Sequence, residues 1–461
     1  MYYRDKHFSV EKKIAMLYIL LLPLRMPMPL TGIAGMFGAC ATYLDFFLHI
    51  FGFALMLMTT HGKLKTNKIA NMFVKLVLFL EIISLSMALL LHNSLGSIDG
   101  DDTITAIFGP SIYYIHYVVI LFYNIYIFGM FTKAEISKIL DKLVLWNLIL
   151  GYIQILICNG AGFIANIYDS LNIFGVFRPA SYITNISRIP VAGAEPASAG
   201  CFIGILVFPY LMSKIISREN MKKNYIQILL WIPIIFFTKS STCYILVFVD
   251  ILVFVILGMK NRCFSKNIIV IFIGLCVGLL VLFFVASNDL ENNPLIEQIR
   301  YLLFEKSTDR SNESSVTRNI PTYINFRIFL EYPFLGVGNG NQGFFYTKYF
   351  PSWGDISLGT FSKINGVADG GVFIPSLFSG YGIIGVCAFL FCTIRYIKKT
   401  IRSKYLLNSF YYMFLISFVV FLVNGFQGDY FGNYLTLFVL CIPFMAERCN
   451  PEYHGKGEIE I

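Results

Sequence analysis

The chain has 461 residues, of which 57% are hydrophobic, 16% are aromatic and only 14% are charged. Soluble proteins carry about 25% charged residues, so this composition excludes a soluble globular enzyme, and the aromatic content excludes disorder, a coiled coil or collagen. A transmembrane helix needs about 20 mostly apolar residues, and the apolar runs predict an all-α polytopic membrane protein with about twelve such helices.

The apolar runs mark the spans in chain order. The first run, residues 14–32, follows Lys12 and Lys13 as in a signal peptide, but no small-residue cleavage site follows before Pro23, so we interpret it as a retained helix. The seventh and eighth runs nearly fuse at residues 238–242, which leaves a count of about eleven or thirteen spans as an alternative. We expect the spans near residues 14–32, 39–60, 69–91, 109–131, 143–163, 197–216, 225–240, 242–259, 267–287, 371–394, 405–424 and 430–446.

Basic residues set the expected orientation of these spans. One alternating set of loops, which includes both chain ends, contains about two thirds of the 36 lysines and arginines, whereas the opposite short loops at residues 93–108 and 424–429 contain none. The positive-inside rule therefore places both termini in the cytoplasm. The net charge of +9 follows from this topology, so nucleic acid is not an expected partner.

Two of the predicted outer loops are long and basic. The first covers residues 164–196, and the second covers residues 288–370, with short helices expected at 294–304 and 317–330. Loops longer than about 12–15 residues are uncommon and are often functional. The domain organisation is therefore nine spans and the first long loop over residues 1–287, a large and partly helical outer loop over 288–370, three spans over 371–446 and a cytoplasmic tail over 447–461.

The large outer loop contains a candidate oxyanion site. A helix with Arg327 is expected to run into a turn that contains Gly336 and Gly338. Guanidinium groups and clustered backbone N–H groups both favour oxyanions, so this pattern suits a phosphate group. The alternative is that Arg327 pairs with Glu331 four residues later and that the glycines only turn the chain. The glycine spacing is not that of a Walker loop, because no Gly-Lys-Ser/Thr follows.

A second candidate residue, Glu195, lies where the first long loop meets the sixth span. Pro196 suits the first position of a helix, so Glu195 stands at the helix start. One interpretation is structural, because the helix dipole stabilises a carboxylate there. The other is a general base at the membrane–water boundary, held near Arg188. The sequence leaves both open.

Metal chemistry is not expected in the outer loops. None of the six histidines lies in either long outer loop, which argues against zinc or histidine-based catalysis there. The ten cysteines lie in or beside apolar segments without a CxxC motif, so neither disulfides nor a thiolate metal site are expected. The acidic run at residues 99–102 either holds a divalent ion or forms a solvated turn, and the turn is the commoner case.

Four segments, in order, resemble the bacterial O-antigen and exopolysaccharide repeat-unit polymerases of the Wzy type, which belong with the O-antigen ligases. The first is Arg188 followed by Gly-Ala-Glu-Pro-Ala-Ser at 193–198, and the second is Thr-Lys-Ser-Ser at 238–241, where Ser241 replaces the usual arginine. The third is Arg327 with the Pro-Phe-Leu-Gly-Val-Gly turn that ends at 338, and the fourth is Gly-Ile-Ile-Gly at 382–385. The likeness covers the C-terminal two thirds of the chain.

The resemblance implies a glycosyltransferase-type polymerase on the outer face of the cytoplasmic membrane. It would join polyprenyl-pyrophosphate-linked oligosaccharides without metal or cofactor: an acceptor hydroxyl attacks the anomeric carbon of the donor, and polyprenyl pyrophosphate leaves. In this scheme Glu195 is the general base and Arg327 the main cation for the leaving group. Further contacts with pyrophosphate and glycan are expected from Arg188, Arg318, Lys239, Gly336, Gly338 and Gly340, with sugar stacking on Tyr346, Tyr349 and Trp353.

The resemblance also implies partners and alternatives. Beyond the lipid-linked glycans and the bilayer, a chain-length regulator and a flippase are expected partners. Ligases of this superfamily have a catalytic histidine shortly before the Gly-Ile-Ile-Gly segment, whereas this chain has Gly371 there, which favours a polymerase over a ligase. A lipid-linked oligosaccharide flippase is the non-enzymatic alternative, for which charges along a central cavity and no large outer loop would be expected.

Overall fold

The described part of the chain is built almost entirely of helices. The computed structural model describes residues 2–24, 44–61, 65–66, 68–98, 100–172, 177–193, 195–263, 313–352, 372–426, 428, 434–446 and 459–460. The helices before the large loop are α1 (Tyr2–Leu21), α3 (Leu44–Thr59), α4 (Lys68–Leu95), η2 (Thr105–Ile107), α5 (Phe108–Met130), α6 (Lys133–Cys158), α7 (Gly162–Leu171), α8 (Ala180–Ile186), α9 (Pro196–Phe202), η3 (Ile203–Val207), α10 (Phe208–Ile216), α11 (Met221–Thr238) and α12 (Ser241–Lys260).

The remaining helices lie in the large loop and the C-terminal spans. They are α15 (Glu313–Glu331), η5 (Asn341–Phe345), α16 (Tyr346–Tyr349), α17 (Phe373–Arg402), α18 (Lys404–Leu407), α19 (Ser409–Asn424), α20 (Tyr434–Leu440) and η7 (Ile442–Phe444). Two short antiparallel strand pairs complete the described elements: β1 (Lys65–Thr66) with β4 (Ile459–Glu460), and β2 (Ser97–Ile98) with β3 (Asp101–Asp102).

The structure confirms an all-α membrane protein. Within the described residues, six helices are long and apolar enough to cross a membrane: Lys68–Leu95, Thr105–Met130, Lys133–Cys158, Pro196–Ile216, Ser241–Lys260 and Phe373–Arg402. Shorter apolar helices at His49–Thr59, Ser409–Asn424 and Leu435–Phe444 coincide with three more predicted spans. The predicted ninth span at 267–287 and the predicted loop helix at 294–304 lie outside the described residues. The total of about twelve spans stays a prediction.

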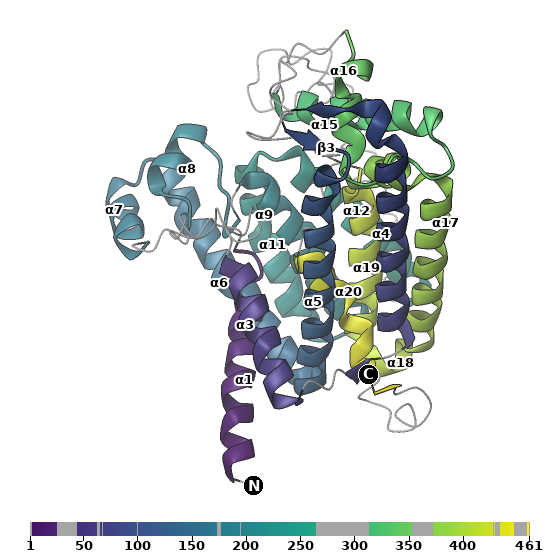
Figure 1. The fold of residues 1–461 in the computed structure, drawn as a ribbon. Helices are drawn as coiled ribbons and strands as arrows, with labels where there is room; N and C mark the ends of the chain where they lie inside the picture. Colours follow the sequence, from purple (N-terminus) through teal and green to yellow (C-terminus); the bar gives the residue numbers. More distant parts are fainter. Residues whose placement is uncertain are drawn as a thin grey trace.

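The long helices run side by side, and the two ends of the bundle differ (Figure 1). The helices α15 and α16 and the strand β3 lie across one end, which we call the outer end. Both chain termini lie toward the opposite end, which we call the inner end. The names follow the predicted topology, in which both termini share one side of the membrane.

The continuous helix Pro196–Ile216 forms the centre of the bundle. The apolar window that marks it as a span is completely buried. Small residues let α12 approach closely, because a Cβ added to Gly200 would lie 2.8 Å from Cys243, and one added to Gly204 would lie 2.6 Å from Cβ of Leu246. The π-helical turn η3 frees a carbonyl of the helix, and Ser417 of α19 donates to the carbonyl of Ile205 at 2.7 Å.

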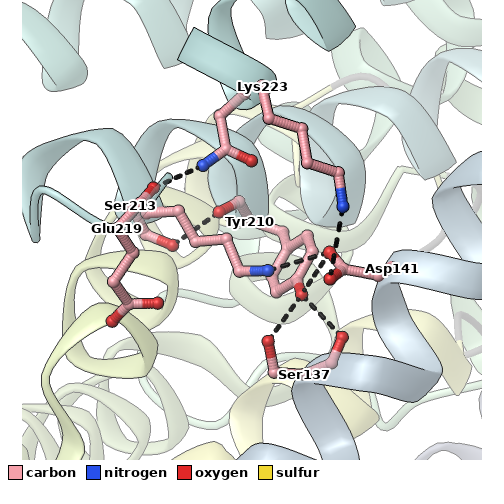
Figure 2. Close-up of polar contacts among 8 residues, drawn as sticks. Ser137, Asp141, Tyr210, Ser213, Glu219 and Lys223 are labelled. Atoms are coloured by element: carbon pink, nitrogen blue, oxygen red, sulfur yellow. Dashed lines mark hydrogen bonds and ion pairs between the residues drawn. The ribbon is translucent and has the colours of Figure 1, made fainter. Parts of the chain in front are cut away.

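An ionic cluster fixes three helices near the inner end (Figure 2). Lys214 of α10 donates to Asp141 of α6 at 2.8 Å, and Lys223 of α11 lies 3.9 Å from the same carboxylate. The hydroxyl of Tyr210 reaches Asp141 at 2.9 Å and the carbonyl of Ser137 at 2.8 Å. The Lys214 side chain is buried, so removal of Asp141 would leave an unpaired buried charge. The cluster therefore orients α6, α10 and α11 relative to one another.

Candidate functional site

The first two of the four segments that carry the resemblance, residues 188–198 and 238–241, meet at the outer end of the bundle. Nε of Arg188, which follows α8, donates to the carbonyl of Thr238 at the end of α11 at 3.0 Å. The next residue, Ile189, donates its N–H to the carbonyl of Phe237 at 3.1 Å. Lys239 follows in a left-handed conformation, with φ +46°, which ends α11. The long loop is thereby fixed to the α11–α12 turn.

Arg188 is the centre of a charged cluster. Burial lowers the pKa of its guanidinium, and Glu195 and two nearby tyrosines act against this effect, whereas Arg318 adds to it. The structure therefore places Arg188, Glu195 and Arg318 within electrostatic reach of one another, although they come from three separate elements. Arg188 is half-buried, and its position is fixed by its hydrogen bond to the α11 terminus.

Glu195 occupies the start of α9, as predicted, but its carboxylate does not cap the helix. Its backbone is extended, with φ −143° and ψ 160°, and its side chain makes no capping hydrogen bond, while Pro196 takes the first helical turn. The Glu195 carbonyl accepts the N–H of Ala199 at 3.1 Å. The Glu195 side chain is exposed. Stabilisation by the helix dipole does not require a capping hydrogen bond, so the structural and the general-base interpretations both stay open, with the carboxylate exposed and within electrostatic reach of Arg188.

Helix α15 brings two further predicted cations to the outer end. It is longer at its N-terminal end than the expected helix at 317–330. An apolar stripe anchors it, because the side chains four residues apart are fully or almost fully buried: Val316, Ile320, Ile324 and Ile328. Arg318, near the start of the helix, is half-buried, whereas Arg327 is exposed. The two arginines lie about 13 Å apart along the helix axis, at 1.5 Å per residue.

The alternative in which Arg327 pairs with Glu331 is not what the structure shows. Glu331 forms its ion pair with Lys348, whose Nζ lies 2.7 Å from both carboxylate oxygens. The Arg327 guanidinium lies 5.7 Å from the ring centroid of Tyr349, and Lys348 lies 5.0 Å from the same ring. Two cations therefore flank one half-buried aromatic ring. Tyr346 is only 2% exposed, so its ring is not open to a sugar, and Trp353 lies outside the described residues.

The three glycines of the turn after α15 serve close packing. Gly336, Gly338 and Gly340 have φ of +67°, +85° and +103°. A Cβ at these positions would lie 2.3, 2.9 and 2.4 Å from backbone oxygens of α17, α4 and η2 respectively. Their N–H groups donate within the protein, to the carbonyls of Tyr332 and Gly380 and to Oε1 of Gln342. These amides are therefore not available to an oxyanion, and the expectation of an amide nest at the three glycines is wrong.

The turn instead packs against a break in helix α17. Here the third and fourth of the segments that carry the resemblance, which end at residue 338 and cover residues 382–385, are in contact. Helix α17 is interrupted at Gly382, with φ +58° and ψ −166°. Across the break, the N–H of Ile383 donates to the carbonyl of Pro333 at 2.8 Å, and that of Gly338 donates to the carbonyl of Gly380 at 2.9 Å. A broken helix at membrane depth needs such partners for its freed backbone groups. We call residues 333–338 and their contacts with α17 the brace.

A buried polar network supports the brace, and the sequence analysis missed it. The hydroxyl of Ser379 donates to Oδ1 of Asn325 on α15 at 2.5 Å. On the other side, Ser84 of α4 accepts the N–H of Asn339 at 3.1 Å, and Tyr381 donates to Tyr114 of α5 at 2.7 Å. Polar residues within apolar spans were the available signal. Their pairing across four elements does not follow from spacing along the chain.

The acidic run forms a capped turn. Oδ1 of Asp102 accepts the N–H groups of Thr105 and Ile104 at 2.8 and 2.9 Å. These hydrogen bonds, chiefly that from Thr105, lower the pKa of the Asp102 carboxyl below its ordinary 3.8. The described residues include no group of three or more histidine, cysteine, aspartate or glutamate side chains placed to hold a metal ion, and residue 99 lies outside them. The solvated-turn interpretation therefore accounts for the described part of the run.

This cap predicts pH dependence of the β2–β3 hairpin. A carboxyl whose pKa is lowered by folding stabilises the folded state above its ordinary pKa, and this stabilisation is lost as the pH falls through the lowered value. We expect hydrogen exchange of residues 97–105, corrected for intrinsic rates, to be faster at pH 3 than at pH 7. The Asp102→Asn variant, which keeps an acceptor oxygen but cannot ionise, should lack this difference. An equal difference in both proteins would contradict the assignment.

Comparisons with known proteins add no relative. No protein-family model matches the chain, and no curated protein matches it. The resemblance therefore rests on the four segments, whose contacts at the outer end are described above.

Proposed function

We propose that the protein is a polysaccharide repeat-unit polymerase that joins polyprenyl-pyrophosphate-linked oligosaccharides on the outer face of the cytoplasmic membrane. One observation carries the proposal. The four segments that resemble Wzy-type polymerases form two contacting pairs at the outer end, through Arg188 Nε and Thr238 O at 3.0 Å and through Ile383 N and Pro333 O at 2.8 Å. Within each pair, segments about fifty residues apart in the sequence are in contact, and this supports the proposal.

In the proposed reaction, a hydroxyl of the acceptor glycan attacks the anomeric carbon of the donor glycan. The bond from that carbon to the pyrophosphate oxygen breaks, and polyprenyl pyrophosphate leaves with the bonding electrons. Glu195 takes the proton of the attacking hydroxyl, since its carboxylate is exposed and does not cap α9. Arg188 and Arg318 stabilise the negative charge that develops on the leaving group, with Lys239 on the adjoining turn as a further cation. This assignment replaces Arg327, the main cation in the scheme that the resemblance implies, because Arg318 rather than Arg327 lies within electrostatic reach of Arg188 and Glu195.

The second arginine of α15 extends the site toward the large loop. Because Arg327 lies about 13 Å beyond Arg318 along the helix axis, the two can hold different parts of a long lipid-linked donor. The ring of Tyr349 stacks on Phe345 and lies beneath Arg327 and Lys348, and Lys348 is paired with Glu331, so Arg327 is the group here that suits contact with a phosphate. Gly336, Gly338 and Gly340 serve the site indirectly, because the brace fixes the C-terminal end of α15.

A polymerization assay tests this function directly. The purified protein, reconstituted with lipid-pyrophosphate-linked repeat units, should produce a ladder of glycan multiples on a gel. The Glu195→Gln variant should lose the ladder, because glutamine cannot accept the proton, while it remains folded in the membrane. Glu219→Gln, which removes a carboxylate near the inner end, should keep a normal ladder. A normal ladder from Glu195→Gln would exclude Glu195 as the base.

The wild-type result separates the alternatives. A single unchanged band with folded protein and natural substrate would contradict polymerization. Transfer of the glycan to a different lipid acceptor would then indicate a ligase, and movement of the lipid-linked glycan across vesicle membranes without transfer would indicate a flippase. Gly371, where a ligase would have its histidine, lies outside the described residues. In the proposed function, a chain-length regulator and a flippase are partners, and both termini face the cytoplasm.

A further inference from the structure

The second half of α15 carries exposed apolar side chains. Leu330 and Phe334 are 71% and 70% exposed, and Phe326, one turn earlier, is exposed as well. Side chains four residues apart lie on one side of a helix, and Phe334 follows in the turn directly after α15. We call Phe326, Leu330 and Phe334 the α15 strip. These residues are not those of the buried stripe that anchors α15, and a helix with water on its free side carries polar residues there.

The α15 strip meets the lipid-facing side of α17. Figure 1 shows α15 across the outer end of the bundle and α17 along its side. The N–H of Ile384 donates to the carbonyl of Phe334 at 3.2 Å, so the two chains touch where α17 resumes after its break. Because α17 is long and apolar enough to cross a membrane, its exposed apolar side faces lipid. At about 3.6 residues per turn, that side is formed by Ile383, Ile384, Leu390, Phe391 and Ile394.

The length of α17 gives the depth of this contact. Arg402, the last residue of α17, is exposed, and a charged residue at the end of a spanning helix lies at or beyond the boundary of the hydrocarbon core. The helix from Ile383 to Arg402 is about 28 Å long at about 1.5 Å per residue, whereas the core is about 30 Å thick. A tilt of α17 would place Ile383 deeper. Phe334, in contact with Ile384, therefore lies inside the core or at its outer boundary.

Helix α4 gives the same depth independently. Ser84 accepts the N–H of Asn339, so the chain just after the α15 strip rests on α4 at this residue. Leu89 and Leu90 of the same spanning helix lie further toward the outer end, and both are exposed. Leu89 is about 7.5 Å beyond Ser84 along the helix axis. The lipid-facing surface of α4 therefore extends outward past the level at which Asn339 docks.

The α15 strip is a fixed surface. Phe326 and Phe329 of α15 pack on Phe378 of α17, with 6.3 and 5.1 Å between ring centroids. The hydrogen bonds of the brace hold the turn with Phe334 on the same helix. A rigid apolar surface that begins at membrane depth and continues a lipid-facing helix side suits acyl chains.

We propose that the C-terminal half of α15 is inserted into the leaflet at the outer end, with acyl chains covering Phe326, Leu330 and Phe334. Helix α15 is then an interfacial helix rather than part of a loop in water. Insertion does not rest on the proposed function. Arg327, one turn before Leu330, lies beside the strip and is exposed. Under the proposed function, a lipid-linked donor in this leaflet would reach Arg327 without leaving the membrane.

Tryptophan fluorescence of the full-length protein in vesicles tests the insertion. Phe334→Trp replaces one exposed aromatic ring with another and places a reporter in the α15 strip. The emission that it adds to that of the wild type should be lost when phosphatidylcholine with brominated acyl chains replaces the unbrominated lipid. Bromine near the headgroup should quench it more than bromine near the chain end, and iodide in the water should quench it little. Leu330→Trp should give the same result.

Two variants are matched controls. Phe391→Trp, on the lipid-facing side of α17 and about 10 Å beyond Ile384 along the axis, should be quenched more by bromine near the chain end. Asn319 is exposed and lies on the same side of α15 as Leu330, about 16 Å toward the start of the helix. Asn319→Trp should be quenched by iodide and not by brominated lipid. Thermal unfolding of each variant checks that it remains folded.

Three results would overturn the insertion. The first is quenching of Phe334→Trp and Leu330→Trp by iodide and not by brominated lipid, which would place the strip in water. The second is quenching by neither, which would show that a second copy of the chain or another protein covers the strip. The third is equal quenching of Phe334→Trp and Asn319→Trp by brominated lipid, which would show that the C-terminal half of α15 is not inserted selectively. A failed polymerization assay would leave all of these measurements unchanged.

Discussion

Replacing Gly336 with alanine is expected to destabilise the outer end of the bundle severely. A Cβ there would lie 2.3 Å from the carbonyl oxygen of Ser379 and 2.6 Å from the N–H nitrogen of Tyr381, both backbone atoms that cannot rotate away. The left-handed conformation, with φ +67°, adds strain. Strain of about 1–2 kcal/mol and overpacking of about 1–3 kcal/mol sum to about 2–5 kcal/mol, against a typical total stability of about 5–15 kcal/mol.

A matched glycine separates this effect from glycine replacement in general. Gly129 lies in α5, has no neighbouring atom within 4 Å of an added Cβ and is not in a left-handed conformation. Gly129→Ala should therefore leave the unfolding temperature unchanged or raise it slightly, because alanine favours helix. Thermal unfolding followed with a thiol-reactive dye suits this chain, since cysteines such as Cys201, Cys243 and Cys441 are buried. Equal unfolding temperatures for the two variants would show that the brace does not hold α17.

The helical architecture could largely be predicted from the sequence, for a simple physical reason. A helix that faces lipid must be apolar over about 20 residues, and this signal is local in sequence. The apolar stripe of α15 is also local, because Val316, Ile320 and Ile324 recur every four residues. Likewise Pro196 identified the start of α9. Each of these features depends only on residues within a few turns of one another.

The use of the glycine turn could not be predicted in the same way. The sequence showed that Gly336 and Gly338 permit an unusual backbone, but two uses were compatible with that pattern: amides open to a phosphate, or a close approach to another element. The choice depends on Ser379 and Gly380, about forty residues later, whose carbonyls the turn meets. The break at Gly382 was hidden for the same reason, because residues 371–394 appear as one apolar run.

The pairing of charges shows a third kind of limit. Spacing suggested that Arg327 and Glu331 could pair on one helix face, yet Lys348, from a different helix, takes the carboxylate at 2.7 Å. Arg188 and Arg318 come from different loops, and their proximity adds like-charge repulsion to the burial cost of Arg188. Such like-charge proximity costs stability, and the nearby carboxylate of Glu195 offsets part of that cost. Functional cation clusters are therefore the places where local sequence rules are least informative.

Removal of Arg188 is expected to reduce chain extension more than removal of any other cation of the cluster. Its guanidinium is half-buried and fixed by the carbonyl of Thr238 at 3.0 Å, so it is already oriented before the donor binds. Loss of one fixed donor to a developing oxyanion costs about 10²–10³ in turnover, and we expect a loss of that size for Arg188→Ala. The measurement is the initial rate of ladder formation with saturating lipid-linked substrate.

Arg178→Ala is the matched control, because Arg178 belongs to the same loop and contributes the same charge. Its guanidinium stacks on the ring of Tyr182 at 4.7 Å, and the variant should stay close to the wild-type rate. Arg188→Lys separates charge from geometry: lysine keeps the charge but lacks the planar fork, so it should restore only part of the rate while the protein stays folded. If Arg188→Ala and Arg178→Ala slow the reaction equally, the cluster acts through general electrostatics, and the assigned role of Arg188 is wrong. A specific loss in Arg188→Ala would instead support the assigned role of Arg188, whose guanidinium is fixed by its hydrogen bond to the end of α11.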